Sequence, residues 1–255
     1  MSARHLTGFW LGRRAYPAVH ALMQQLFEER RAGRVGDTVL LLEHEPVITL
    51  GRGAKLENLL VNPKTLTELG VGLVDTGRGG DVTLHAPGQL IAYPIVDLSP
   101  DRQDVRKYVQ GLTSVMSRLV APHGLATGSM TGKIGLWVDR ESLARWPGED
   151  KARVPVKIGA IGVRISRWIT QHGFALNLTT DLALFQLIVP CGIHEFGVAS
   201  LEALTGIRLE VADAARLALP EIAEGLGARV DELIDASELG SNQLLERARA
   251  VRRPG

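Results

Sequence analysis

Apolar residues alternate along residues 154–165, but the alternation changes register in the middle of the segment. The first apolar residues stand at even positions and the later ones at odd positions: Val154, Val156, Ile158, Ile161, Val163 and Ile165. Successive side chains of a strand point to opposite faces, so a slip of one residue would turn half of this apolar set toward solvent. The segment therefore predicts a long strand with a bulge or turn at Gly159 and Ala160.

Two amphipathic helices are indicated by apolar residues spaced three and four positions apart. The first stripe covers residues 19–27 and the second covers residues 105–119. We expect Ser99 to cap the second helix, with Pro100 as its first residue. Toward the end of the chain, four arginines and one acid within the last sixteen residues predict a loosely held basic tail.

Short apolar runs predict strands at residues 39–42, 82–85 and 90–96. Pro94 indicates that the last of these strands lies at a sheet edge or carries a bulge. Strands with one polar face outnumber continuous apolar ones. This pattern favours an α+β fold, with a mixed or antiparallel sheet and flanking helices, over a doubly wound parallel sheet. The charged residues 139–153 are predicted to form an exposed loop.

Composition narrows the possible functions. A chain of 255 residues suits a single domain, and its net charge of +1 creates no field that would attract nucleic acid or a membrane surface. Cys191 is the only cysteine, so no intrachain disulfide can form and we expect a soluble cytoplasmic protein. The glycines and histidines match no P-loop, dinucleotide or zinc motif, and we expect no metal and no cofactor.

Cys191 is the first candidate for a chemical role. It stands in the segment Val189-Pro190-Cys191-Gly192, where a proline ends an apolar run and a glycine lets another group approach. A loop position suits a nucleophile. The thiolate is the attacking form, so a nearby cation is needed to lower the thiol pKa from about 8.5. The alternative is a small buried structural side chain.

Lys157 is the candidate cation, because it interrupts an otherwise apolar segment just before the change of register. A lysine taken out of water exchanges protons near neutral pH. A pair formed by Lys157 and Cys191 would thus activate the thiol and then move protons during acyl transfer. The alternative is a lysine on the solvent face of an edge strand.

A third motif, at residues 78–85, joins a glycine turn to an alternating strand. Two glycines leave backbone N–H groups open to a ligand, as in anion-binding nests. The alternation after them turns Thr83 and His85 to the same side of the strand. The alternative is a plain turn followed by a histidine whose hydrogen bonds are satisfied in the core.

Taken together, five motifs in this order resemble the lipoyl(octanoyl) transferases, which move an octanoyl group from acyl carrier protein to a lysine of lipoyl domains. The motifs are Glu43-His44-Glu45-Pro46-Val47-Ile48-Thr49-Leu50-Gly51, residues 78–85 with Pro87-Gly88-Gln89, Lys157-Ile158-Gly159-Ala160-Ile161-Gly162, His172-Gly173-Phe174-Ala175-Leu176-Asn177 and Pro190-Cys191-Gly192. The resemblance covers residues 37–206, about two-thirds of the chain.

The resemblance implies a single catalytic domain like that of the biotin and lipoate protein ligases, with a sheet around an acyl tunnel. It implies that Cys191 is the acyl-thioester nucleophile and that Lys157 lowers the pKa of its thiol. It also implies an acyl-binding wall made of Arg78, Gly79, Gly80, Asp81, Val82, Thr83, Leu84, His85, Ala160, Ile161, Gly162, Gly173, Phe174 and Ala175.

The implied partners are octanoyl-acyl carrier protein as donor and, as acceptors, the lipoyl domains of 2-oxoacid dehydrogenase E2 subunits and the glycine cleavage H protein. We expect a monomer that binds neither nucleic acid nor membrane. Residues 1–218 are predicted to form the octanoyltransferase catalytic domain, and residues 219–255 a helical C-terminal extension with a basic tail. A local docking patch for the acidic partners is expected among Arg13, Arg14, Arg52, Lys55 and Arg78.

Three alternatives remain open at the level of sequence. An ATP-dependent lipoate- or biotin-type protein ligase shares the expected fold and needs no cysteine nucleophile. A thioesterase would use the same pair of residues with water as the acceptor. A non-catalytic acyl-binding module would bind the octanoyl carrier without any covalent change at Cys191.

Overall fold

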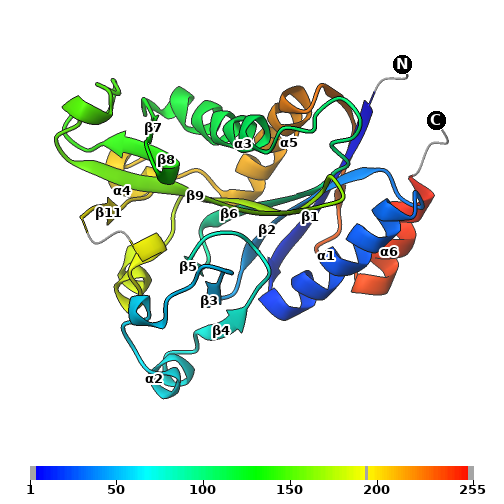
Figure 1. The fold of residues 1–255 in the computed structure, drawn as a ribbon, viewed down its shortest axis with the longest axis horizontal. Coiled ribbons are helices and arrows are strands. Elements are labelled where there is room, and N and C mark those ends of the chain that lie inside the picture. Colours follow the sequence, from blue (N-terminus) through cyan, green and yellow to red (C-terminus); the bar gives the residue numbers. More distant parts are fainter. Residues whose placement is uncertain (1–3, 193–194, 252–255) are drawn as a thin grey trace.

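The computed structural model describes residues 4–192 and 195–251, apart from the side chain of Cys191. Its strands form one large mixed sheet and one small sheet, and helices flank them (Figure 1). The expected α+β fold is thereby confirmed. None of the described helices has the length and apolar content that crossing a membrane requires.

The large sheet has the strand order β12-β1-β2-β6-β10-β9-β8-β7, and the short strand β11 pairs with β9. Parallel pairs join β1 to β2 and β12, whereas the ladders from β2 through β6, β10, β9 and β8 to β7 are antiparallel. The bounds of these strands are β1 Arg4–Arg14, β2 Asp37–His44, β6 Gln89–Ile95, β7 Gly128–Met130, β8 Lys133–Asp139, β9 Pro155–Ser166, β10 Ile169–Asn177, β11 Gly197–Val198 and β12 Ala228–Asp235.

Helices cover both faces of the large sheet (Figure 1). One face packs against α3 (Val105–Val120) and α5 (Val211–Gly225), and the other against α1 (Tyr16–Arg31) and α6 (Ser241–Ala250). Each face of the sheet forms a hydrophobic core with its helices, and strand β2 contributes side chains to both cores. Its alternate side chains, such as Val39 and Leu40, face opposite helix layers. The two predicted helices, α1 and α3, are thus confirmed. Two further short helices are α2 (Pro63–Glu68) and α4 (Leu201–Thr205).

Strand β9 contains the predicted change of register. Its pairing with β8 shifts by one residue, because Trp137 pairs with Lys157 but Leu136 pairs with Gly159. The extra residue is Ile158, one position before the expected Gly159 and Ala160. Ile158 and, beyond the shift, Ile161 both contact the core under α3 and α5. The bulge therefore keeps both apolar halves on one face, as expected, while Lys157 and Ala160 face the other side of the sheet.

Two local expectations are wrong. Strand β6 lies between β2 and β10, in the sheet interior, although it contains Pro94. The ladder with β10 ends at Ala92, so β6 is paired on one side only where Pro94 stands, and the missing N–H is tolerated there. Helix α3 begins five residues later than expected, capped by the side chain of Asp104 rather than by Ser99.

The small sheet has the order β4-β3-β5 and lies beside the large sheet (Figure 1). Its strands are β3 Val47–Leu50, β4 Gly72–Asp75 and β5 Val82–His85. Alternation in β5 places Val82 and Leu84 in an apolar core with α2 and the turn at residues 182–187. Thr83 and His85 consequently face the large sheet, where the two sheets enclose polar side chains.

The C-terminal part of the chain is built onto β1 and α1. Strand β12 pairs in parallel with β1, and α6 packs on α1 with Leu244 and Ala248 buried. Arg249 of α6 donates a hydrogen bond of 2.8 Å to Glu29 of α1. The expectation of a loosely held tail is therefore wrong as far as Val251. Helix α5 crosses the boundary proposed at residue 218, and the division into a catalytic domain and an extension stays a prediction.

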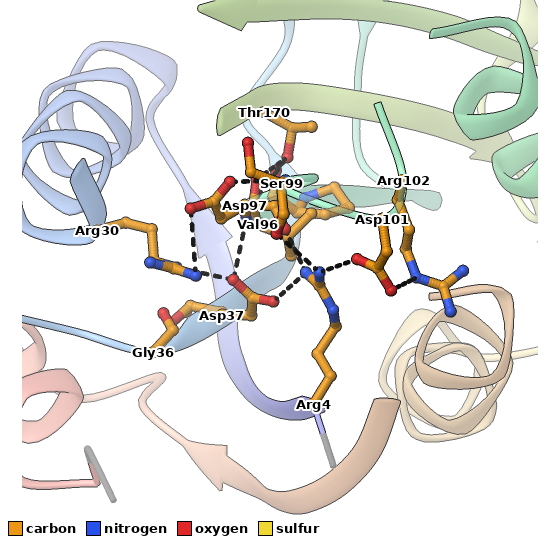
Figure 2. Close-up of polar contacts among 12 residues, drawn as sticks. Arg4, Arg30, Gly36, Asp37, Val96, Asp97, Ser99, Asp101, Arg102 and Thr170 are labelled. Carbon is orange, nitrogen blue, oxygen red and sulfur yellow. Dashed lines mark hydrogen bonds and ion pairs between the residues drawn. The ribbon is translucent and has the colours of Figure 1, made fainter. Parts of the chain in front are cut away.

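A network of charges, here called the Asp37 cluster (Arg4, Arg30, Asp37, Asp97 and Asp101), lies at the start of β2 (Figure 2). Asp37 is buried and accepts hydrogen bonds from Arg4 at 2.9 Å, Arg30 at 2.7 Å and the backbone N–H of Asp97 at 2.9 Å. Arg4 also donates to Asp101 at 3.1 Å. The cluster joins β1, α1, β2 and the segment after β6 at this end of the sheet.

Candidate active site

Two adjoining cavities lie between β5 of the small sheet and strands β9 and β10 of the large sheet. We call the one lined by Pro190, the residue before Cys191, the near cavity, and the other the far cavity. Thr83, Ala160 and Ala175 line both. The near cavity is further lined by Gln89, Lys157, Gly159, Asn177, Phe185, Pro190 and Val198. The far cavity is further lined by Arg78, Gly80, Asp81, His85, Tyr93, Ile161, Gly162, His172, Gly173 and Phe174.

Lys157 stands at the wall of the near cavity. Its side chain is buried, with 6 % of the residue exposed, which excludes the alternative of a lysine on a solvent face. The ammonium lies over the indole ring of Trp137, 5.6 Å from the ring centroid. Strand β11 pairs with this part of β9, and the carbonyl of Lys157 accepts the N–H of Ala199 at 2.9 Å. The lysine is thus enclosed between β8, β11 and the cavity.

The segment leading to Cys191 is held by backbone pairing with residues 56–60. The N–H of Leu60 donates to the carbonyl of Leu187 at 2.9 Å, and the N–H of Val189 donates to the carbonyl of Asn58 at 2.8 Å. Residues 190–192 then form a single 3-10 turn whose first residue lines the near cavity. The side chain of Cys191 itself lies outside the described part of the structure.

Asp81 fixes this turn from the side of β5. One carboxylate oxygen accepts the backbone N–H groups of Lys55 at 3.0 Å and Val82 at 2.7 Å, and the other accepts the side-chain amide of Asn58. A Cβ atom at Gly192 would lie 3.1 Å from both the Asn58 amide and the Asp81 carboxylate. The turn therefore rests on this pair, at a residue whose φ of +65° suits glycine.

A chain of hydrogen bonds crosses the floor of the near cavity. The amide of Gln89 donates to Asn177 at 2.8 Å, and Asn177 donates to the carbonyl of Ala199 at 3.0 Å. The Gln89 oxygen is therefore left to accept, and Nδ1 of His85 donates to it at 2.8 Å. This fixes the tautomer of His85, so that its Nε2 is an acceptor. Burial places the pKa of His85 well below its usual range, which keeps the ring neutral.

Further imidazole and phenol rings gather around the far cavity. Burial lowers the pKa of His44 to about 4 and that of His172 to about 3, so both rings are neutral at neutral pH. Nε2 of His44 lies 3.1 Å from the hydroxyl of Tyr93. Nε2 of His172 has no hydrogen-bond partner among the described residues, although the side chain is buried. The far cavity thus contains uncharged polar atoms that a ligand or water can meet.

Among the described residues, Arg78 is the one arginine that lines the far cavity. Its guanidinium donates to the hydroxyl and the carbonyl of Thr49 in β3 and to the carbonyl of Gly79 at 3.1 Å. The adjoining backbone is tightly packed, because a Cβ atom at Gly51 would lie 2.2 Å from the carbonyl oxygen of Gly80. The glycines of this motif therefore serve close backbone approach around a fixed arginine.

The structure brings most of the expected acyl-binding residues together. Of the expected set, only Gly79, Val82 and Leu84 do not line either cavity. Val82 and Leu84 instead belong to the core of the small sheet, since they alternate with the lining residues of β5. The N–H of Gly79 donates to the carbonyl of Val163 at 3.0 Å.

Several lining residues were missed by sequence reasoning. Gln89 and Asn177 are direct cross-strand partners, and Tyr93 and His172 lie on the same face of β6 and β10. Alternation along β10 from Ala175 indicates Asn177, whereas Gln89 follows as its cross-strand partner only once β6 and β10 are known to pair. The pairing of these strands, far apart in sequence, is the missing information.

Two residues of the expected docking patch are held by the fold, and one of them, Arg78, is buried. Arg78 is 7 % exposed. Arg14 donates to the backbone carbonyls of Leu11, Ala236, Ser237 and Leu239, which attaches it to the segment after β12. A docking role for Arg13, Arg52 and Lys55 stays a prediction.

Comparison with known proteins places this chain in a family. Residues 15–223 match the family model described as the lipoyl protein ligase A/B catalytic domain. An octanoyltransferase of Myxococcus xanthus is 46% identical over 208 residues, which cover 82% of this chain and 56% of that protein. An octanoyltransferase of Chloroflexus aurantiacus is 44% identical over 231 residues, which cover 90% of this chain and 94% of that protein.

The fold has relatives among solved structures. The structure of a bi-partite lipoate protein ligase from Thermoplasma acidophilum matches with a TM-score of 0.64 over 100% of this chain and 99% of that chain, at 14% identity. Such a low identity shows the shared fold alone, and it confirms the expected ligase-like architecture. By the family match and by its relatives, this chain belongs to the lipoyl protein ligase A/B catalytic domain family and is an acyltransferase of the octanoyltransferase group.

Proposed function

We propose that the chain moves an octanoyl group from octanoyl-acyl carrier protein to a lysine of a lipoyl domain, through a thioester on Cys191. The observation that carries this proposal is the position of Lys157. Its buried ammonium lines the same cavity as Pro190, the residue before Cys191, and that cavity adjoins a second one lined by the glycine motifs. Names of the relatives support the acyl group, and the donor and acceptors follow from the family resemblance.

The first step is the attack of the Cys191 thiolate on the thioester carbonyl of the donor. A new carbon–sulfur bond forms, the bond to the pantetheine sulfur breaks, and the pantetheine thiol leaves with a proton. In this step Lys157 takes the proton of the Cys191 thiol and supplies one to the leaving sulfur. One thioester replaces another, so the step is nearly balanced in free energy and needs no nucleotide.

In the second step the amine of the acceptor lysine attacks the acyl-enzyme. An amide bond forms, the bond to the Cys191 sulfur breaks, and Lys157 accepts the proton that the amine loses. Amide formation from a thioester is downhill, which drives the cycle. The order of events predicts ping-pong kinetics, because the donor leaves before the acceptor reacts.

The acyl chain would extend from the near cavity into the far cavity, past the small side chains of Thr83, Ala160 and Ala175. Each buried methylene contributes about 0.8 kcal/mol, so an octanoyl chain gains several kcal/mol of binding. The acceptors would be lipoyl domains of 2-oxoacid dehydrogenase E2 subunits and the glycine cleavage H protein. A monomer and a cytoplasmic location stay predictions.

A transfer assay tests the proposal. The chain is mixed with octanoyl-acyl carrier protein and a lipoyl domain in the absence of ATP, and the mass of the lipoyl domain is followed. The expected result is one octanoyl amide on a lysine. Transfer only from free octanoate with ATP would assign a ligase instead, and release of free octanoate without modification of the acceptor would assign a thioesterase.

A further inference from the structure

Residues of strand β8 contact the side chain of Lys157, and they have no role in the reaction proposed above. Trp137 is the cross-strand partner of Lys157, at the last pair before the bulge in β9, which puts both side chains on the same face of the sheet. Leu136 and Val138, the neighbours of Trp137, face the opposite core under α3 and α5.

Gly135 makes room for the lysine stem. A Cβ atom at this position would lie 2.4 Å from Cε of Lys157 and 2.5 Å from the carbonyl oxygen of Gly159. The φ of Gly135 is +145°, a conformation that side chains disfavour. The lysine stem therefore passes directly over the backbone of β8, and the ammonium emerges above the indole ring.

Trp137 is itself held in one orientation. It is 1 % exposed, and its Nε1 donates to the carbonyl of Lys133 at 2.9 Å. Phe196 packs its ring against the indole at a centroid distance of 5.5 Å and an interplanar angle of 79°. The ammonium of Lys133 lies over Phe196, 5.2 Å from its centroid. The aromatic pair thus stands between the two lysines and presents one ring to each.

We propose that Trp137 is a positioning residue for the acyl-transfer reaction, which holds the ammonium of Lys157 at the near cavity by a cation–π contact that Phe196 buttresses. An indole face attracts an ammonium more strongly when both groups are buried, as Trp137 and Lys157 are. The contact acts on Lys157 and touches neither the acyl group nor the reacting atoms. This inference rests on the proposed function.

The ionisable groups around Lys157 are few in the described part of the chain. Lys133 faces the aromatic pair from β8, Asp81 stands at the turn that carries Cys191, and His85 contacts the floor of the cavity through Gln89. The indole variants below leave all of these groups in place. A change in pH dependence would therefore report on Lys157 and the thiol that it serves.

The test measures the rate at which octanoyl-acyl carrier protein acylates the chain in a single turnover, between pH 5.5 and 9. Trp137→Leu removes the aromatic face, and we expect the half-maximal rate to move about one unit to higher pH. Trp137→Phe keeps an aromatic face but no indole N–H, and its profile should stay near that of the unchanged chain. The KM for the donor should be similar in both variants.

Val138→Ala is the matched control, because it loosens the same strand on its opposite face. It should lower thermal stability without moving the pH profile. If Trp137→Leu does not fold, Phe196→Leu replaces it, since Phe196 is partly exposed and its loss should shift the profile in the same direction by a smaller amount. An unshifted pH profile in Trp137→Leu, or in Phe196→Leu where that variant replaces it, would overturn the inference. An equal shift in Val138→Ala would overturn it as well.

Failure of this inference is distinct from failure of the proposed function. If the unchanged chain forms no acyl-enzyme at any pH, the covalent route itself is wrong. If the unchanged chain is acylated and the aromatic variants follow the same pH profile, the covalent route stands and the positioning role of Trp137 is wrong.

Discussion

Strand β2 carries a buried polar side chain at each end, charged and ion-paired at one end and neutral at the other. At its first residue, the carboxylate of Asp37 lies between the guanidinium groups of Arg4 and Arg30 (Figure 2). At its last residue, the ring of His44 is neutral and belongs to the group of rings at the far cavity. In the Asp37 cluster, buried charges form ion pairs, whereas the histidines at the far cavity are uncharged.

This difference separates a structural site from a chemical one. At the start of β2, the carboxylate of Asp37 has its hydrogen-bond partners within the protein. At the cavities, Nε2 of His172 has no partner in the described residues, and the buried ammonium of Lys157 faces an aromatic ring and a cavity wall. Changes at the two places should therefore affect stability and activity separately.

The largest effect is expected from Lys157→Met, which keeps the length of the side chain and removes its charge. Loss of a group that moves protons lowers rates by about 10²–10⁴-fold. We expect such a loss in transfer to a lipoyl domain, while thermal stability changes little because methionine fills the space of the lysine stem. Steady-state kinetics and thermal melts measure both. A variant with nearly full activity would remove Lys157 from the mechanism.

Asp37→Asn should show the reverse pattern. It removes the buried carboxylate that lies between the guanidinium groups of Arg4 and Arg30, and we expect a loss of about 2 kcal/mol in the free energy of unfolding with unchanged transfer activity. Asp101→Asn is the control, because Asp101 is half exposed and its ion pair should contribute little. Urea unfolding and transfer assays on both variants decide; a drop in activity without a drop in stability would contradict the comparison.

The neutral histidines predict a pH dependence of stability. Because burial lowers the pKa of His44 to about 4 and that of His172 to about 3, the unfolded chain takes up protons below about pH 6.5 while the folded chain does not. The free energy of unfolding should therefore fall as the pH falls from 6.5 to 4, by at most about 1.4 kcal/mol per pH unit for each histidine.

Comparison with His172→Gln isolates one of these contributions. Urea unfolding at several pH values should give a shallower fall for this variant, because one proton fewer distinguishes the two states. Equal slopes for the variant and the unchanged chain would show that His172 is protonated alike in both states.

The smallest effect is expected where the two cavities meet. Ala160→Val adds two methyl groups at a residue that lines both cavities. The enlarged side chain should shorten the acyl chain that fits, and each methylene no longer buried costs a factor of about 4 in binding. We expect kcat/KM to fall for octanoyl donors relative to hexanoyl donors. An equal loss for both donors would place the acyl chain elsewhere.

Many features of the fold can be predicted from local sequence patterns. The bulge of β9 follows from the change of register in residues 154–165, and α1 and α3 follow from their apolar stripes. The motif residues meet at the cavities because the alternation of β5 turns Thr83 and His85 to one side. Such features need only neighbours in sequence to be recognised.

What the sequence did not reveal depends on which distant strands pair. Pro94 is tolerated in the sheet interior because the β10 ladder stops short of it. Strand β12 joins β1 in parallel from more than two hundred residues away. The link from Gln89 to Asn177 and the contact of Trp137 with Lys157 are cross-strand relations of the same kind. Local periodicity carries no information on register between separate strands.

The mechanism depends on an acyl group carried by the sulfur of Cys191, and mass spectrometry of the intact and the digested chain measures this most directly. The chain is mixed with octanoyl-acyl carrier protein without acceptor, quenched in acid and digested, in parallel with Cys191→Ser. We predict a mass increase of about 126 Da that maps to Cys191 and disappears when a lipoyl domain is added. Unmodified Cys191 during active transfer, or full transfer by Cys191→Ser, would contradict the account.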